Sequence, residues 1–193
     1  MAKVVVNEFL TLDGVMQAPG GPDEDRSGGF DHGGWQSQYA EDGTGDFVDD
    51  NFRRAGALLL GRNTYDIFAA YWPHADNELA PTMNGLRKFV ASRTLKEPLA
   101  WQNSALLASD AADGVRRLKA SEDKDLLVFG SGDFVQTLIR SGLVDEFRLA
   151  IYPLVIGKGK RLFRDESVQS KYRLTDSITS PAGVLLLTYV PAE

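Results

Sequence analysis

The stretch Val128–Phe134 reads VFGSGDF and joins two segments of opposite character. Leu126–Phe129 is an apolar, strand-like run, whereas Phe134–Ile139 has the character of a helix. A tight turn between a strand and a helix needs one glycine at most, but this turn has a glycine on each side of Ser131. Glycine lets an anion approach the backbone closely, and the N-terminus of a helix attracts negative charge. The stretch therefore predicts a strand–turn–helix unit that contacts a phosphate.

Strand-like and helix-like segments alternate along most of the chain. The expected strands are residues 3–10, 57–60, 88–91, 106–109, 126–129 and 146–156, followed by a hairpin of residues 172–178 and 184–190. The expected helices are residues 46–55, a helix capped by Asn63 or Thr64 that ends near Trp72, a weak one near 83–86, one after a cap at Asp110, and 134–141. This order predicts an α/β fold with a mixed sheet, mainly parallel, with a C-terminal antiparallel hairpin and helices on both faces.

Residues 16–46 interrupt this alternation. They are rich in Gly, Pro and Asp and predict a long loop. A loop of this length in a compact domain is usually either functional or disordered. We expect an ordered lid over the active site, anchored by Phe30, Trp35 and Tyr39, although Trp35 could equally stack on a flat substrate ring. No linker divides the chain, so residues 1–193 are expected to form a single domain.

Composition excludes several classes of site. The net charge of -6 argues against a nucleic-acid-binding surface, and the absence of cysteine excludes disulfides, zinc–thiolate sites and a cysteine nucleophile. His32 and His74 are too few for a histidine-based metal cluster, so we expect no metal. There is no apolar run of membrane-spanning length and no signal-peptide pattern. We therefore expect a cytoplasmic protein whose partner is a small molecule.

Three of the predicted strands end in similar chemistry. The strand ends are Gly61-Arg62-Asn63-Thr64, Ser92-Arg93-Thr94 and Gly130-Ser131-Gly132. Ligands of open α/β sheets bind at the carboxyl ends of the parallel strands. Two of these turns lead into helices, and arginine has the fork geometry that suits phosphate. Together the three ends predict a ligand with several separated phosphates.

The pattern favours NADPH among such ligands. The Rossmann fingerprint is only partial because Val135 replaces its third glycine, and no acidic residue follows at a strand end about 20 residues later to bind a ribose 2′-hydroxyl. Arg62 and Arg93 stand where a phosphate would need positive partners. We therefore expect NADPH to be preferred over NADH, with its 2′-phosphate bound by Arg62, Arg93 or both, helped by Ser92.

The chain resembles the dihydrofolate-reductase-like superfamily, specifically the C-terminal reductase domain of the bifunctional riboflavin-biosynthesis deaminase-reductase. The matching segments are TLDGV, LLLGRNTYDIF, FVASRTL, the run from Leu126 to Phe163 and the final hairpin. The resemblance implies an NADPH-dependent reductase of a small heterocyclic substrate, similar to 5-amino-6-(5-phosphoribosylamino)uracil reductase. The implied cofactor-binding residues are Gly61, Arg62, Asn63, Thr64, Ser92, Arg93, Thr94, Gly130, Ser131, Gly132, Asp133 and Phe134.

The substrate side is less well defined by the sequence. Asp13 and Gly14 match the family's turn beside the nicotinamide and the substrate, so Asp13 is the catalytic candidate and Gly14 a substrate-binding one. Dihydrofolate reductases bind the pterin through an acid on the first helix, where this chain has Asp46, Asp49 and Asp50, and we take Asp50 as a candidate together with Trp35. These acids could instead complement the helix dipole.

Other possibilities stay open. His32 is a weaker candidate for a proton donor, and Lys158, Lys160 and Arg161 are expected to form a solvated turn rather than a substrate-phosphate site. A dinucleotide-binding protein without turnover and a true dihydrofolate reductase are the alternative functions. Related proteins commonly pair, and residues 147–156 and 184–187 are strongly apolar, so we expect a homodimer built on the C-terminal strands.

Overall fold

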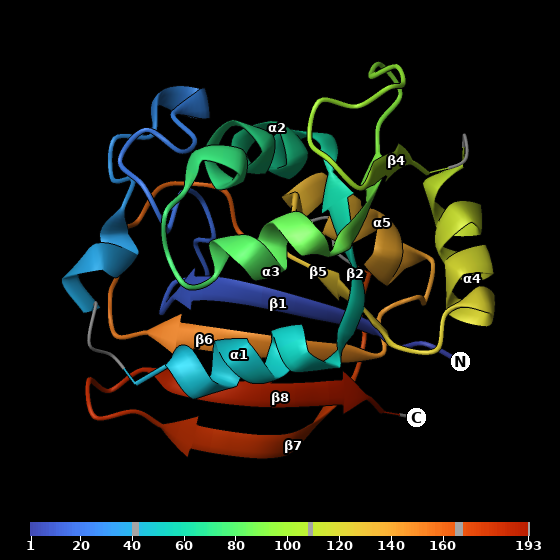
Figure 1. Ribbon diagram of the computed structural model, residues 1–193. Coiled ribbons are helices and arrows are strands. Elements are labelled where there is room, and N and C mark those ends of the chain that lie inside the picture. Colours follow the sequence, from blue (N-terminus) through green and yellow to red (C-terminus); the bar gives the residue numbers. More distant parts are fainter. Residues whose placement is uncertain (40–42, 108–109, 165–167, 193) are drawn as a thin grey trace.

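The computed structural model describes residues 1–39, 43–107, 110–164 and 168–192. The described residues are organised around one eight-stranded sheet with the order β4-β3-β2-β5-β1-β6-β8-β7 (Figure 1). The strands are β1 (Val4–Thr11), β2 (Ala55–Gly61), β3 (Arg87–Ala91), β4 (Ser104–Leu106), β5 (Asp125–Val128), β6 (Glu146–Tyr152), β7 (Tyr172–Thr179) and β8 (Leu185–Pro191). The α-helices are α1 (Gly45–Arg54), α2 (Arg62–Tyr71), α3 (Ala80–Gly85), α4 (Ala111–Ser121) and α5 (Gly132–Arg140).

The sheet is mostly parallel. In the sheet order, every neighbouring pair from β4 through β3, β2, β5 and β1 to β6 is parallel. The pairs β6–β8 and β8–β7, at the other edge, are antiparallel. The predicted fold class is thus confirmed. The first strand lies in the middle of the sheet, between β5 and β6, and Val4, Val5 and Val6 are fully or almost fully buried. A continuous apolar run is what a strand covered on both faces requires.

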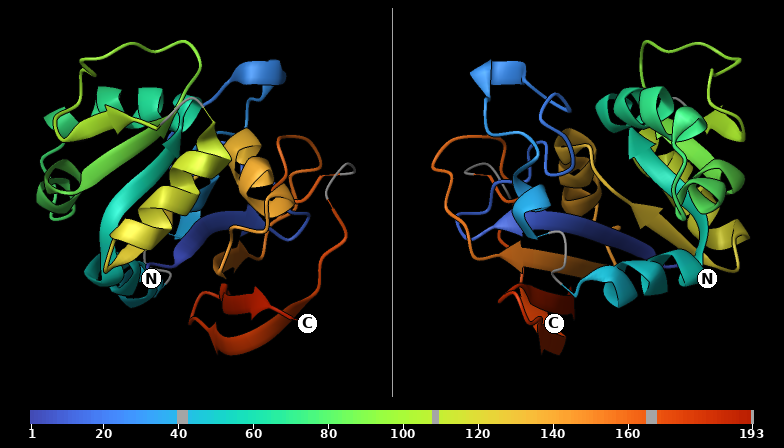
Figure 2. Two further views of the ribbon diagram at one scale, coloured as in Figure 1. Left: turned by 90° about the vertical axis from the view of Figure 1, so that its right-hand side faces the viewer. Right: turned by 60° about the vertical axis from the view of Figure 1, so that its left-hand side comes forward.

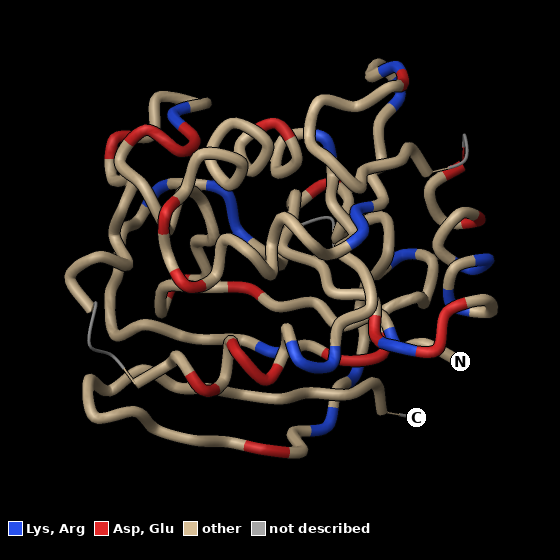
Figure 3. The backbone as a smooth tube through the Cα atoms, viewed as in Figure 1, with Lys and Arg blue, Asp and Glu red and all other residues tan. Residues whose placement is uncertain are grey.

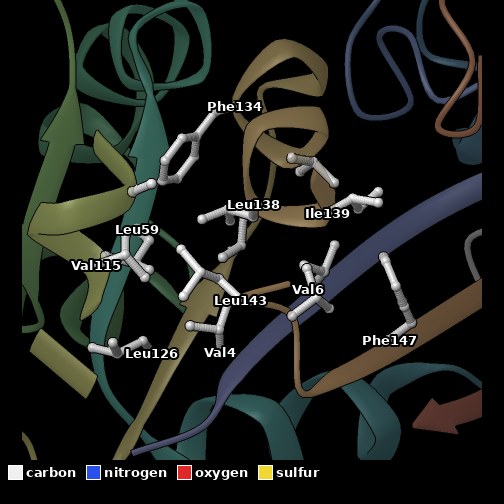
Figure 4. Packing of buried hydrophobic residues seen from close by; sticks show 14 of the residues in the cluster. Val4, Val6, Leu59, Val115, Leu126, Phe134, Leu138, Ile139, Leu143 and Phe147 are labelled. Atoms are coloured by element: carbon white, nitrogen blue, oxygen red, sulfur yellow. The ribbon is translucent and has the colours of Figure 1, made fainter. Parts of the chain in front are cut away.

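Helices cover both faces of this sheet (Figure 2). On one face, α5 places Phe134, Leu138 and Ile139 over the strand residues Leu59 and Val6 (Figure 4). On the other face, residues of α1, α2 and α3 pack against alternate residues of the same strands. The C-terminal end of α1 is further tied to the sheet, because the guanidinium of Arg54 binds the carboxylates of Asp125 and Glu146, each at 2.9 Å. Basic and acidic positions are interspersed along the described chain (Figure 3).

Several predicted boundaries need correction. The prediction that Asn63 or Thr64 caps α2 is wrong, because β2 passes directly into the helix and Gly61 occupies the cap position. The strand expected at residues 106–109 is β4, which begins and ends earlier, and residues 108 and 109 lie outside the described part. Strand β6 ends at Tyr152, since the next residue is Pro153, which has no N–H group for a ladder. The predicted cap of α4 is confirmed: the N–H of Asp113 donates to the side chain of Asp110.

The long loop is ordered wherever it is described. It contains two short 3-10 turns, Ser27–Gly29 and Trp35–Tyr39, and residues 40–42 lie outside the described part. Phe30 and Trp35 are buried, and Tyr39 packs against the same apolar cluster, which confirms the three predicted anchors. The indole Nε1 of Trp35 also donates to the carbonyl of Gln17 at 2.8 Å.

Candidate functional site

The three strand ends singled out in the sequence lie side by side. Strands β3, β2 and β5 are parallel neighbours, so their carboxyl ends share one edge of the sheet. A cavity of about 790 Å³ lies there. Its lining includes Gly61, Arg62, Asn63, Ser92, Arg93, Thr94, Ser131, Asp133 and Phe134. We call it the strand-end cavity.

A second cavity, of about 430 Å³, adjoins the first. The remaining predicted cofactor residues, Thr64, Gly130 and Gly132, line it. Four residues line both cavities: Asn63, Ser131, Asp133 and Arg164. We call this second space the inner cavity. All the predicted cofactor residues therefore line one or both of these two adjoining cavities.

The glycines of the opening stretch have a packing reason as well as a ligand-binding one. A Cβ on Gly61 would lie 2.0 Å from Oγ of Ser131, so the end of β2 and the turn after β5 can touch only because Gly61 has no side chain. Gly130 has a φ of +79°, a conformation that favours glycine. A Cβ on Gly132 would lie 2.7 Å from Nη2 of Arg164. The turn is thus fitted between β2 and the arginine, with its backbone at the junction of the two cavities.

The strand-end cavity is well supplied with groups that bind anions. Helices α2 and α5 both begin at its edge, and no side chain in the described part of the chain caps either N-terminus. Their first N–H groups are therefore available for an anion.

The arginines of this cavity differ in their partners. Arg62 pairs with Asp66 at 3.3 Å and donates to Oγ1 of Thr94. The side chains of Arg93 and Arg140 make no hydrogen bond or ion pair with any residue of the described ranges. An acid, Asp110, also lines the cavity, but its carboxylate accepts the N–H of Asp113 at 2.9 Å. Arg93 is thus better placed than Arg62 to bind an added phosphate.

The lining of the inner cavity combines apolar and acidic side chains. Phe52 and Phe129 stack with ring centroids 5.5 Å apart, and Phe68 lies 6.3 Å from Phe129. The apolar part of the lining also includes Val48, Ile67, Trp72, Leu79 and Met83. Residues 16–20 of the long loop and the acids Glu8, Glu24 and Asp25 also line this cavity. Such a mixture of apolar surface and a few polar groups is typical of a small-molecule site.

Glu8 is the most unusual group in this cavity. It lies on β1 and is only 7% exposed. Burial, reinforced by the charge of Glu24, raises its pKa to about 8, although the backbone of Gly130 acts in the opposite direction. Burial also raises the pKa of Glu24, whose Oε2 accepts the N–H groups of Gly20 and Gly21 at 2.7 and 3.1 Å. Sequence reasoning missed both acids. The signal for Glu8 was a lone acid inside the apolar strand VVVNEFL.

Comparison with known proteins identifies the family. Residues 2–186 match the RibD C-terminal domain. The chain belongs to this family. Protein YyaP of Bacillus subtilis (strain 168) is 30% identical over 193 residues, which cover 97% of this chain and 94% of YyaP.

Two solved structures resemble the chain as well. The putative riboflavin biosynthesis protein from Shewanella sp. PV-4 is 22% identical with a TM-score of 0.72, and the match covers the whole of both chains. RibD of Acinetobacter baumannii is 15% identical with a TM-score of 0.65, and this chain covers 59% of it. These likenesses support the predicted fold class, a mostly parallel sheet with an antiparallel C-terminal hairpin.

The four residues predicted for catalysis or substrate binding lie outside both cavities. Asp13, Gly14, Trp35 and Asp50 line neither cavity. Asp50 binds Arg148 at 2.7 Å, and Trp35 packs edge-on to Tyr152 with ring centroids 5.4 Å apart. Gly14 occupies a tight turn with a φ of +79°. The described contacts of these residues are structural, and their roles toward a substrate stay predictions.

Asp13 has a clear role in joining two segments. Its carboxylate accepts hydrogen bonds from Oγ1 of Thr11 at 2.6 Å and from the N–H groups of Ile156 and Gly157 at 3.2 and 2.8 Å. Partial burial opposes its ionisation, but these hydrogen bonds prevail and lower the pKa of Asp13 to about 2. Its carbonyl also accepts a hydrogen bond from Arg161 at 2.8 Å. The end of β1 is thereby fixed to the 156–161 turn.

The other charged candidates hold the long loop in place. Lys160 binds Asp25 at 2.7 Å, and Lys158 binds Asp31 at 2.7 Å. His32 is half exposed and lies 3.3 Å from Asp31. The expectation of a merely solvated turn is therefore wrong for Lys160, which lines the inner cavity. No described group of three or more acidic or histidine side chains is arranged to bind a metal, and no described helix is long and apolar enough to span a membrane.

Proposed function

We propose that this chain is an NADPH-dependent reductase that reduces a small heterocyclic substrate. The observation that carries the proposal is the pair of adjoining cavities, one lined by arginines and helix N-termini and the other by aromatic rings and buried acids. Membership of the RibD C-terminal family agrees with it. When bound, NADPH would supply the hydride, and the protein would supply position and protons.

The residues present fit such a cofactor. The glycine-rich turn and the first N–H groups of α2 and α5 would bind the diphosphate, because no described side chain caps either helix. Arg93 and Ser92 would bind the 2′-phosphate. Arg62 would contribute less, since Asp66 already neutralises part of its charge.

The inner cavity would hold the substrate. The stacked Phe52 and Phe129 offer an apolar face for a planar ring. Lys160 and Arg164 are the basic groups of its lining, and each is paired with an acid, Asp25 and Asp133 respectively. The long loop forms one side of this cavity, which supports its proposed role as a lid.

Calorimetric titration tests the choice of cofactor. A hydrogen bond to a charged group contributes roughly 1.5–3 kcal/mol. At about 1.4 kcal/mol per decade, one such contact corresponds to a 10- to 150-fold preference. We expect wild-type protein to prefer NADPH over NADH by about that factor, and Arg93→Ala to remove most of the preference, with a smaller effect of Arg62→Ala. Arg116→Ala, at an exposed ion pair on α4, is the control.

Two results would contradict the proposal. Equal wild-type affinity for NADPH and NADH would contradict the proposed 2′-phosphate site. No binding of either cofactor would contradict a dinucleotide site of any kind. Turnover is then measured as NADPH oxidation with a panel that includes 5-amino-6-(5-phosphoribosylamino)uracil and dihydrofolate. Tight NADPH binding without oxidation on any substrate would favour the alternative, a binding protein without turnover.

A further inference from the structure

Glu8 is a buried acid with an unused hydrogen-bonding atom in the inner cavity. Its side chain is more than nine-tenths buried, and its Oε1 has no hydrogen-bond partner among the described residues. A Cβ placed on Gly130 would lie 3.7 Å from this oxygen and 3.0 Å from Oγ1 of Thr64. Glu8 therefore stands beside the glycine-rich turn, where the two cavities meet. A buried polar atom without a partner is costly, so its retention needs a reason.

The charges around Glu8 do not neutralise it. The other charged groups of the inner cavity are Glu24, Asp25, Asp133, Lys160 and Arg164. The two cations bind Asp25 and Asp133, and neither forms an ion pair with Glu8. Glu24, itself an acid, faces the same space. A hydrogen bond from the backbone of Gly130 favours the carboxylate form of Glu8, but burial and the charge of Glu24 outweigh it. The neutral carboxyl group, which can donate a hydrogen bond, is therefore favoured.

We propose that Glu8 is the general acid of the reduction, donating its proton to the heteroatom of a C=N or C=O bond in a planar substrate. This inference rests on the proposed function. The π bond of the substrate breaks, its carbon gains a hydride for which NADPH is the source, and its nitrogen or oxygen gains the proton of Glu8. The products are the reduced substrate, NADP⁺ and the Glu8 carboxylate, which regains a proton from water. Glu24 acts as a positioning residue that keeps Glu8 protonated.

The pKa of Glu8, about 8, agrees with this role. An acid with that pKa is mostly protonated at neutral pH and can donate, whereas an ordinary glutamate is ionised there. The rate should therefore be highest below pH 8 and fall as the pH rises through that value.

The first test needs neither cofactor nor substrate. In protein labelled with ¹³C at the glutamate carboxyl carbons, one resonance should titrate near pH 8. It should be absent in Glu8→Gln, and Glu24→Gln should move its midpoint to lower pH. Glu146→Gln serves as the matched control, because Glu146 is buried outside both cavities and binds Arg54. Absence of any glutamate that titrates above pH 6, or its persistence in Glu8→Gln, would overturn the inference.

The second test uses the panel substrate that the wild-type protein reduces. General acid catalysis contributes about 10²- to 10⁴-fold, so Glu8→Gln should lower kcat by at least about 100-fold at pH 7 while the Kd for NADPH changes less than about 2-fold. The wild-type decline in kcat above pH 8 should vanish in Glu8→Gln. Thermal melting checks that the variant is folded. If NADPH oxidation persists unchanged in Glu8→Gln, the acid role alone is overturned. If the wild-type protein does not bind NADPH, the proposed function is overturned and this inference with it.

Discussion

Gly61 shows how one absent side chain can determine the shape of the site. Its backbone angles, φ -71° and ψ 159°, are open to any residue, so the requirement for glycine is purely steric. Gly61→Ala would drive a methyl group against Ser131. We expect the free energy of unfolding to fall by about 1–3 kcal/mol and NADPH affinity to fall by at least about 10-fold. Urea denaturation and calorimetry measure the two effects.

The control for this change is Gly85→Ala. Gly85 ends α3, and nothing lies within 4 Å of the place its Cβ would occupy. The free energy of unfolding of the Gly85→Ala variant should stay within about 0.5 kcal/mol of the wild-type value. Equal behaviour of the two variants would show that the close approach of β2 to the turn is not needed.

Asp13 predicts how stability depends on pH. Because its pKa is about 2 in the folded protein and about 3.9 in an unfolded chain, it stabilises the fold above pH 4, and this contribution is lost as the pH falls toward 2. Solvent near the Asp13 carboxylate screens its interactions, so we expect Asp13→Asn to lower the free energy of unfolding by about 1 kcal/mol at pH 7. Urea denaturation at pH 7 and pH 3 should show a smaller acid-induced loss in the variant. An identical loss in both proteins would contradict this role.

Residues differ in how far the sequence alone predicts their roles. The grouping of the three strand-end segments was predictable because each segment follows its own strand, and neighbouring parallel strands bring such ends together. Glu8 and Arg164 were not, since their surroundings come from segments far apart in the chain: Glu8 faces Glu24 and Gly130, and Arg164 packs on Gly132. The hydrogen bonds of Asp13 to Ile156 and Gly157 were equally unpredictable, because these two partners lie more than 140 residues away.

Among the elements, the long loop depends most on one anchor. Trp35 is buried, donates a hydrogen bond to Gln17 and packs on Tyr152. We expect Trp35→Ala to lower the unfolding free energy by about 3–5 kcal/mol, and Trp35→Phe, which loses mainly the hydrogen bond, by about 1 kcal/mol. Limited proteolysis should cut residues 20–33 much faster in the alanine variant. Unchanged protection of this segment would show that the loop is held elsewhere.

Deleting residues 20–33 tests the lid in a different way. The segment contains the buried Phe30, so some loss of stability is expected along with the loss of turnover. NADPH binding should survive, because the strand-end cavity has no lining residue in that segment. Calorimetry on the deletion variant decides this. Full activity on the wild-type substrate would contradict the lid.

The elements themselves followed from the sequence more closely than their ends did. Periodicity and the Gly, Pro and Asp turn signals are local, so every predicted strand that lies in the described ranges has a counterpart in the sheet. The start of α2 was misplaced because steric fit against Ser131, not a capping side chain, determines where it begins. Strand β6 was predicted too long, since the apolar pattern continues past Pro153 although the ladder does not.

For the whole molecule, the outer strand β7 is the remaining surface of interest. It ends the sheet, and Leu174 and Ile178 on it are 46% and 51% exposed. We propose that two copies associate through this C-terminal edge, as exposed apolar strands favour pairing. Light scattering at micromolar concentration should give the mass of a dimer for the wild-type protein and of a monomer for Ile178→Lys. A monomeric wild-type protein would reject the proposal.

The central position of β1 has a consequence for biosynthesis. Its neighbours, β5 and β6, begin 121 or more residues later in the chain. On a ribosome the apolar run Val4–Val6 therefore emerges long before the strands that will cover its edges, and only β6 completes them. Because strands so far apart in the chain pair late, folding is slow, and apolar segments stay exposed to solvent until their partners are available. A ribosome-bound chain that has not yet emerged as far as residue 146 should bind a chaperone, and a chain whose residues 1–193 have all emerged should not.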